Sequence, residues 1–257
     1  MKIVFLTSKS LRGALFLKEM KVNNIPLEAI LIEDQDLKPC ERVKKAITQL
    51  GLAKTIKIAL KRGLGIIVPR IVEDWIRTSF YLAYADTVYV VDNFNGMKCE
   101  KILQKIQPDL IVLGNSRIIR KNILNIPKIG IINAHPGLLP RYRGLHTLQW
   151  AIYYGDNIGA TVHFINEGVD TGGIIKQDVV NIEANDTIAS LNDKVRVLCA
   201  KLMAETVLKF VDGEYIQVIP QSIENGQQYY KMQKKLLGET EKKLQIITGR
   251  LKILREY

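Results

Sequence analysis

Cysteine is scarce in this chain, which has only Cys40, Cys99 and Cys199 among its 257 residues. The three are odd in number, far apart and never in a C-x-x-C pair, so the sequence favours neither a disulfide framework nor a zinc knuckle. Histidine pairs at metal-ligand spacing, such as H-x-x-x-H, are also missing, and we therefore expect no bound metal. We interpret the three cysteines as small buried residues.

Long apolar runs are absent as well. The longest uncharged apolar stretches, such as Leu64–Pro69, fall far short of the ~18 to 20 residues that a membrane span needs. Only the apolar residues Ile3–Leu6 follow Met1-Lys2, which is too short a run for the core of a secretory signal. We expect no stable membrane insertion and a cytoplasmic location.

Acidic residues are outnumbered, with 26 Asp and Glu against 37 Lys and Arg, and the formal net charge is +11. The excess lies in two segments, because residues 38–77 carry +7 and residues 226–257 carry +5. Proteins that stack nucleic-acid bases interleave aromatic and basic side chains. In residues 38–77, however, Trp75 is the only aromatic residue. We expect solvated helix faces away from any site and no nucleic-acid partner, with a non-catalytic basic scaffold that binds membrane or RNA as an alternative.

Strand-like and helical patterns alternate along the chain. Short apolar runs predict strands at residues 2–7, 27–33, 87–91, 109–113, 129–132, 160–165 and 174–180, and helices are predicted at 10–20, 96–106, 147–154 and 188–211. Because parallel strands need crossover connections, this order predicts an α/β fold with a doubly wound, mainly parallel, Rossmann-like sheet. We expect a catalytic domain at 1–212 and a short C-terminal extension at 213–257, sufficient for a hairpin and a helix.

Ligands of such sheets bind beyond the carboxyl ends of the strands. The segment after the first strand, Thr7–Gly13, lacks G-x-G-x-x-G, so a dinucleotide cofactor is not indicated. Ser10 and Arg12 are candidates for holding a phosphate at the helix amino terminus. For a lone serine such as Ser10, an N-cap is the stronger interpretation.

All three histidines, His135, His146 and His163, fall within one 29-residue window. Asn133 and His135 lie at the end of an apolar run and are two residues apart, so in extended backbone their side chains point the same way. Asp170 lies in a glycine-rich turn after the next predicted strand. Two adjacent strands would bring these three side chains together.

Asn133, His135 and Asp170 suit acyl transfer to an amine. The imidazole can accept the proton that the amine loses while the carboxylate holds the ring, and the amide can donate to an oxygen that becomes negative. No serine or cysteine lies in the motif, so direct attack by the amine is favoured over a covalent enzyme intermediate.

Each of these residues also has a purely structural interpretation. Asn133 and Asp170 are typical of caps and turns. His163 is either part of the site or a core histidine that supports it, and we expect His146 to contact acceptor or solvent. The segment Arg141–Arg143 either binds an anionic ligand or lines the surface.

Four separated blocks resemble the formyltransferases that use N10-formyltetrahydrofolate: NAHPGLLPRYRG at 133–144, GD at 155–156, GATVHF at 159–164 and GVDTGGII at 168–175. The resemblance covers roughly residues 85–211. It implies a formyltransferase core, N10-formyltetrahydrofolate as co-substrate, Asn133, His135 and Asp170 as the catalytic residues, and a cis Leu139-Pro140 bond. Gly137 stands where the family usually has serine, so a hydroxyl contact there is in doubt.

The resemblance also implies binding residues. We expect the folate to contact Gly114, Asn115, Arg117, Ile118, Ile119, Glu167, Gly168 and Val169. We expect the acceptor to contact Ser10, Arg12, Tyr142, Arg143, Gly144 and Trp150.

The acceptor is assigned by elimination within the family. Methionyl-tRNA formyltransferases carry a further tRNA-binding domain, the deformylases carry an amino-terminal regulatory domain, and glycinamide ribonucleotide transformylases have a phosphate loop that Thr7–Gly13 does not match. The remaining branch formylates nucleotide-linked amino sugars for surface polysaccharides, such as lipopolysaccharide, and we expect that acceptor. Glycinamide ribonucleotide or another small amine is the alternative. The sugar, the base and the oligomeric state stay open, a homodimer being one option.

Overall fold

The computed structural model describes residues 1–34, 81, 83–85 and 87–255. Its centre is a seven-stranded sheet in the order β3-β2-β1-β4-β5-β7-β8. The strands are β1 (Ile3–Ser8), β2 (Ala29–Glu33), β3 (Val88–Val91), β4 (Leu110–Asn115), β5 (Gly130–His135), β7 (Ile158–Phe164) and β8 (Ile174–Val180). Pairing is parallel from β3 to β5 and antiparallel at β5–β7 and β7–β8, which confirms a mainly parallel α/β sheet.

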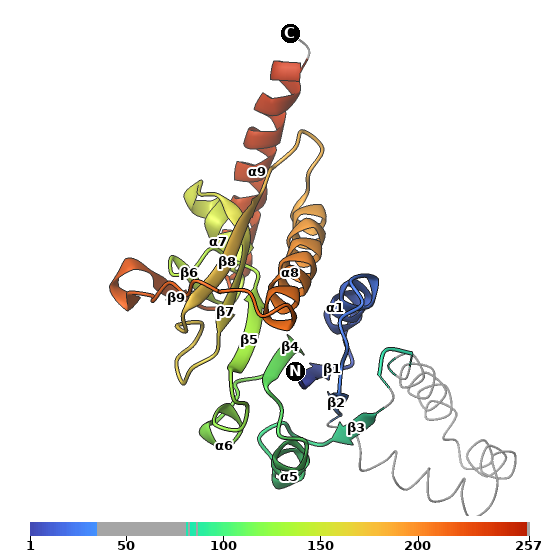
Figure 1. Ribbon diagram of the computed structural model, residues 1–257. Coiled ribbons are helices and arrows are strands. Elements are labelled where there is room, and N and C mark those ends of the chain that lie inside the picture. Colours follow the sequence, from blue (N-terminus) through green and yellow to red (C-terminus); the bar gives the residue numbers. More distant parts are fainter. Residues whose placement is uncertain (35–80, 82, 86, 256–257) are drawn as a thin grey trace, which may run out of the picture.

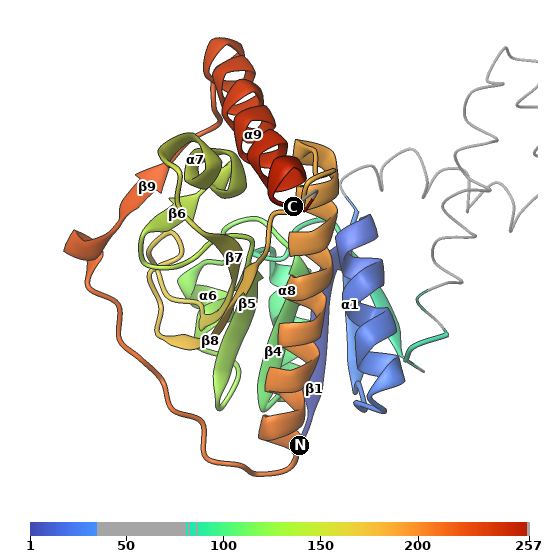
Figure 2. The ribbon, with the colours of Figure 1, turned by 90° about the horizontal axis from the view of Figure 1, so that it is seen from above.

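Helices cover both faces of this sheet (Figures 1 and 2). On one side lie α1 (Leu11–Val22) and α8 (Ile188–Val211), and on the other α5 (Met97–Ile106) and α6 (Lys121–Leu124). Side chains alternate between the faces along each strand, so Ile3 and Phe5 join the core with α1 and α8, and Val4 packs with α5. Cys99 and Cys199 are buried, as predicted, and Cys40 lies outside the described residues.

Strand β5 is longer than its apolar pattern predicts. The expected end at Ile132 or Asn133 is wrong, because antiparallel pairing with β7 continues through His135 opposite Thr161. Backbone pairing with a neighbour extends a strand whatever the polarity of its side chains. Asn133 and His135 therefore lie on a paired strand rather than in a loop beyond it, whereas Asp170 lies in the turn after β7.

The C-terminal extension does not form the expected hairpin within the described residues. After α8 the chain runs along the outside of the molecule (Figure 2) to β9 (Gln227–Tyr229), whose partner is β6 (Tyr142–Gly144), in parallel. The final helix, α9 (Lys234–Arg255), packs against α7 (Thr147–Tyr154). A hairpin alone is only marginally stable in water, whereas β9 gains a partner next to the core.

Two expectations came from the composition: the placement of the basic residues 38–77 and the lack of a membrane-spanning segment. Residues 38–77, expected on helices away from the site, lie outside the described residues, so their placement stays a prediction. Within the described part of the chain, no helix is both long and apolar enough to span a membrane.

Candidate active site

A cavity of about 950 Å³ lies at the carboxyl edge of the parallel strands. Its lining comes from the segments after β4 and β7, the end of β5, the start of α7, the first turns of α8 and β9. Sequence-distant segments meet there because the carboxyl ends of parallel strands share one edge of the sheet.

Strands β4 and β5 stop pairing before either strand ends, which leaves a gap at this edge. Their register ends at Leu113 opposite Asn133, although β5 continues to His135. Arg12, from the first turn of α1, reaches into the gap and donates from its guanidinium to the backbone oxygen of Ala134. The Arg12 Nε is buried and has no hydrogen-bond partner among the residues that the structure describes. A cation therefore lies beside the candidate catalytic strand.

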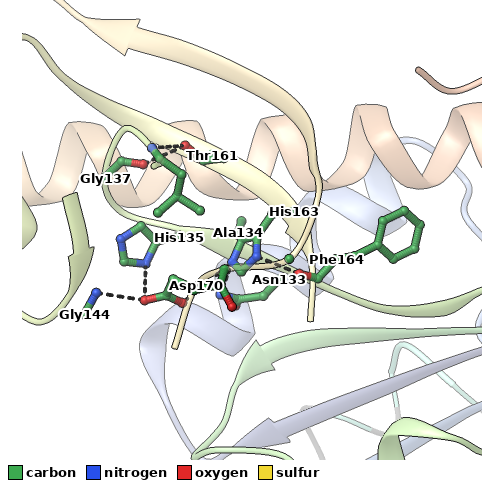
Figure 3. Close-up of polar contacts among 12 residues, drawn as sticks. Asn133, Ala134, His135, Gly137, Gly144, Thr161, His163, Phe164 and Asp170 are labelled. Atoms are coloured by element: carbon green, nitrogen blue, oxygen red, sulfur yellow. Dashed lines mark hydrogen bonds and ion pairs between the residues drawn. The ribbon is translucent and has the colours of Figure 1, made fainter. Parts of the chain in front are cut away.

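His135 is buried, with 3% of its surface exposed, and both ring nitrogens have close neighbours. Figure 3 shows the contact with Asp170. Its Nε2 lies 2.8 Å from the backbone oxygen of Tyr142, and its Nδ1 lies 3.3 Å from Asp170 Oδ2. A carbonyl oxygen only accepts hydrogen bonds, so Nε2 carries the proton of the neutral ring and Nδ1 faces the carboxylate.

Asp170 reaches His135 by a route that the sequence did not indicate. The expected meeting of comparable strand ends is wrong, because β7 is antiparallel to β5 and its last residue, Phe164, pairs with Ile132. The loop after β7 instead folds back toward His135. Asp170 has a left-handed backbone (φ 53°), its backbone oxygen accepts from the Gln221 side chain, and its Oδ2 accepts from the Gly144 N–H at 2.9 Å.

Asn133 is oriented by His163, which is fully buried on the adjacent strand. The His163 Nδ1 lies 2.8 Å from the Phe164 backbone oxygen, so Nδ1 donates. The His163 Nε2 then accepts from the Asn133 side-chain amide, 3.3 Å away. Asn133 keeps its second amide N–H at the cavity, which it lines. His163 is thus a buried core histidine that supports Asn133, and it does not line the cavity.

Burial keeps both histidines neutral near pH 7. Desolvation lowers the pKa of His135 below its usual value, and the Asp170 charge and the Tyr142 carbonyl oppose this effect. Desolvation and the neighbouring His135 lower the pKa of His163 to about 4. The site therefore contains a proton acceptor beside a carboxylate at neutral pH.

Eight of the fourteen predicted ligand-contacting residues line the cavity. The cavity is lined by Asn115, Arg117, Ile118, Ile119, Gly168 and Val169 on the side expected for folate, and by Arg12 and Gly144 on the side expected for the acceptor. His146 also lines it.

Six predicted contacts do not line the cavity, and three of them are Gly114, Glu167 and Ser10. Gly114 packs against Phe5, so close that an added Cβ would lie 2.2 Å from that ring. Glu167 is exposed and pairs with Lys121 at 3.0 Å. Ser10 caps α1 by accepting from the Gly13 N–H, the interpretation that a lone serine favoured.

Tyr142, Arg143 and Trp150 also lie outside the cavity lining and instead hold its walls. The Tyr142 side chain is buried and its hydroxyl donates to Asp156, so only its backbone oxygen reaches His135. Arg143 is buried and donates to the Gly226 oxygen rather than facing a ligand. The Trp150 indole donates to the Tyr230 oxygen, at 3.0 Å.

Residues that the motifs did not reveal hold the loop after β5. Thr161 donates to the Gly137 oxygen at 2.7 Å, and Gln177 donates to the Leu139 oxygen at 2.7 Å. The Leu139-Pro140 bond in this loop is cis, as predicted. On α8, Asn192 and Arg196 line the cavity, and their four-residue spacing on one helix face was the only available signal.

The family model described as Formyl transferase matches residues 1–207. This chain belongs to that family. A methionyl-tRNA formyltransferase from Thermodesulfovibrio yellowstonii is 35% identical over 186 residues, which cover 72% of this chain and 52% of that protein. The chain therefore spans about half the length of this curated relative.

Solved structures of other formyltransferases share the fold. A 4-N formyltransferase from Francisella tularensis has a TM-score of 0.58 at 16% identity, with 95% of this chain and 87% of that chain covered. Glycinamide ribonucleotide transformylase 1 from Symbiobacterium toebii has a TM-score of 0.57 at 22% identity, with 86% and 94% covered. At these identities the similarity establishes the fold only.

The cavity fits the family's co-substrate, N10-formyltetrahydrofolate. Leu113, Ile118, Ile165 and Val169 give one side of it an apolar lining, which suits a flat heteroaromatic ring, and the polar strand end lies beyond. Among the described residues, no group of three or more His, Cys, Asp and Glu could hold a metal ion.

The geometry of the site suits formyl transfer to an amine. When bound, N10-formyltetrahydrofolate would supply the formyl group, and its bond to the folate nitrogen would break as the amine takes the group over. Asn133 could donate its second amide N–H to an oxygen that gains negative charge, and a donor fixed on a strand needs no rearrangement to do so. The His135 Nδ1 and the Asp170 carboxylate could together hold the proton that the amine loses before the departing folate nitrogen takes it up. The Tyr142 oxygen fixes the ring orientation.

Proposed function

We propose that this enzyme transfers the formyl group of N10-formyltetrahydrofolate to the amine of a nucleotide-linked amino sugar, giving a formamido sugar. One observation carries the choice of acceptor: Gln228, Tyr229 and Tyr230 of the C-terminal extension form part of the cavity wall. The alignment with the Francisella tularensis 4-N formyltransferase takes in 95% of this chain, so it reaches into this extension. The alignment with the Symbiobacterium toebii glycinamide ribonucleotide transformylase takes in 86% of this chain, which is a smaller share.

The charges of the cavity favour an anionic acceptor. Arg12 lines it beside Arg196, which pairs with Asp193, and a nucleotide-linked sugar carries two phosphates that a cation such as Arg12 can bind. The Arg12 guanidinium already donates to the Ala134 oxygen, which fixes its position without neutralising its charge. The phosphates would then bind on the α1 and α8 side, and the amine would approach Asp170 and His135.

A second candidate is formylation of methionyl-tRNA. The 35% identity to the Thermodesulfovibrio yellowstonii methionyl-tRNA formyltransferase favours it. The excess of Lys and Arg in residues 226–257 suits a polyphosphate partner as well.

The two candidates are separated by offering acceptors in parallel with N10-formyltetrahydrofolate. The set contains nucleotide-linked 3-amino and 4-amino sugars, glycinamide ribonucleotide and initiator methionyl-tRNA, and mass spectrometry detects the added formyl group. The Asp170→Asn variant and the N-acetylated form of each sugar nucleotide are the controls. Formylation of an amino-sugar nucleotide, with the others near background, supports the proposal. Efficient formylation of methionyl-tRNA without sugar formylation would replace it with the second candidate.

A further inference from the structure

Strand β6 supplies the backbone groups that hold both His135 and Asp170. The Tyr142 oxygen lies 2.8 Å from His135 Nε2, and the Gly144 N–H donates to Asp170 Oδ2 at 2.9 Å. These two contacts fix the relative position of the imidazole and the carboxylate. Any movement of β6 by a few tenths of an ångström therefore changes the geometry of proton transfer.

The three residues of β6 are too few to hold their own position. Among the described residues, their strand partner is β9, in the C-terminal extension. The Gln227 N–H donates to the Arg141 oxygen at 3.1 Å, and the Leu145 N–H donates to the Tyr229 oxygen at 2.9 Å. The two hydrogen bonds bracket the segment that contacts His135 and Asp170.

The two backbones touch, so neither strand can shift alone. A Cβ added to Gly226 would lie 1.7 Å from the Pro140 oxygen, and one added to Gly144 would lie 2.3 Å from the Tyr229 oxygen. The Tyr229 ring stacks on the Tyr142 ring, with centroids 5.3 Å apart and planes at 24°. Displacement of β9 is thus transmitted to the Tyr142 oxygen.

We propose that the segment Gly226–Tyr229 is a positioning element for formyl transfer, which fixes the His135 ring and the Asp170 carboxylate through β6. Its backbone acts through Tyr142 and Gly144 and touches neither His135 nor Asp170. The C-terminal extension therefore has two tasks, since its side chains line the cavity and its backbone maintains the geometry of the proton acceptor.

The test compares Gly226→Ala with Gly238→Ala. The first substitution forces β9 away from the Pro140 oxygen. The second, in α9, places a methyl group that meets no atom of the described residues outside its own helix turn within 4 Å. Long-range ¹H–¹⁵N spectra report the tautomer of each histidine, and the chain has only three, with His135 assigned from the spectrum of His135→Asn. The probe is the protein alone, so the result does not depend on which acceptor is formylated.

We expect His135 in the wild type and in Gly238→Ala to carry its proton on Nε2. In Gly226→Ala both His135 nitrogen signals should move toward the average of a tautomer mixture, while those of His163 stay unchanged. Circular dichroism and thermal unfolding verify that each variant is folded. Unchanged His135 signals in folded Gly226→Ala would overturn the proposal.

If Gly226→Ala does not fold, a second pair of variants tests the proposal. Gln227→Pro removes the N–H that donates to the Arg141 oxygen, and Gln227→Ala keeps it and removes only an exposed side chain. The His135 signals should move in the proline variant alone. Identical spectra for the two folded variants would also overturn the proposal.

Discussion

The His135 Nε2 lies 2.8 Å from the backbone oxygen of Tyr142, and this contact determines which ring nitrogen faces Asp170. The sequence suggested that the carboxylate holds the ring while the imidazole accepts the proton of the amine. In the structure the Tyr142 carbonyl contacts one ring nitrogen and Asp170 contacts the other, and His135 and Asp170 both line the cavity. In the proposed reaction the proton from the amine would therefore be accepted by the His135 and Asp170 pair and not by the imidazole alone.

Replacing His135 by Asn should lower formyl transfer by about 10²-fold or more, because it removes the proton acceptor. The ring is buried, so the variant should also lose about 1 to 2 kcal/mol of stability with the bond to Tyr142. Steady-state turnover and urea unfolding measure the two effects. His146→Asn, also at the cavity, is the matched control and should change turnover only a few-fold. Full activity of folded His135→Asn would refute the assignment.

Asp170→Asn should reduce turnover by a similar factor while the protein stays folded. Asparagine tolerates the left-handed backbone at this position (φ 53°), and its side-chain oxygen can still accept from the Gly144 N–H. Only the negative charge beside His135 is lost. Turnover and thermal unfolding are compared with wild type. If activity is kept, Asp170 serves only to close the turn.

The alternation of apolar runs and helical patterns was sufficient to predict the sheet and its main helices. Pattern could not show that β7 runs antiparallel to β5, because period-two alternation carries no strand direction. The meeting of Asn133, His135 and Asp170 was therefore predicted correctly from an incorrect strand arrangement. The folded-back loop that brings Asp170 to His135 depends on contacts from Gln221, which is distant in sequence.

The sequence predicted least well which polar side chains face the cavity. Tyr142 and Arg143 looked like ligand-binding side chains because of their type, yet both are buried and hold neighbouring segments. Ser10 and Glu167 likewise make a cap and a surface ion pair. Residue type indicates what a side chain can bind, but only the packing decides whether it faces the cavity.

The stability of the protein should fall as the pH decreases from 6.5 toward 4. His163 is buried as the neutral ring with its pKa lowered to about 4, so in this range the unfolded chain binds a proton that the folded protein does not. The free energy of unfolding should decrease by about 2 to 3 kcal/mol from this group. Urea unfolding of wild type and His163→Gln at several pH values measures it. Equal pH dependence in both proteins would contradict the burial argument.

Arg12→Met should raise the KM of an anionic acceptor by about ten-fold or more, because the cation at the cavity is lost. Arg141→Met is the matched control, since that guanidinium is exposed and pairs with Asp156 at 2.7 Å, outside the cavity lining. Steady-state kinetics with saturating N10-formyltetrahydrofolate measure the KM of the acceptor for both variants. An equal small effect of the two substitutions would show that Arg12 only supports the strand.

The most direct test of the account is the combined effect of Asn133→Ala, His135→Asn and Asp170→Asn on the rate of formyl transfer. When residues act as one unit, a single substitution already removes most of the rate acceleration that they provide together. The triple variant should therefore be no more than about ten-fold slower than the slowest single variant. Stopped-flow single-turnover rates on the best acceptor of the screen measure this. Single losses that multiply in the triple variant, or a single variant with wild-type rate, would contradict a shared proton-transfer site.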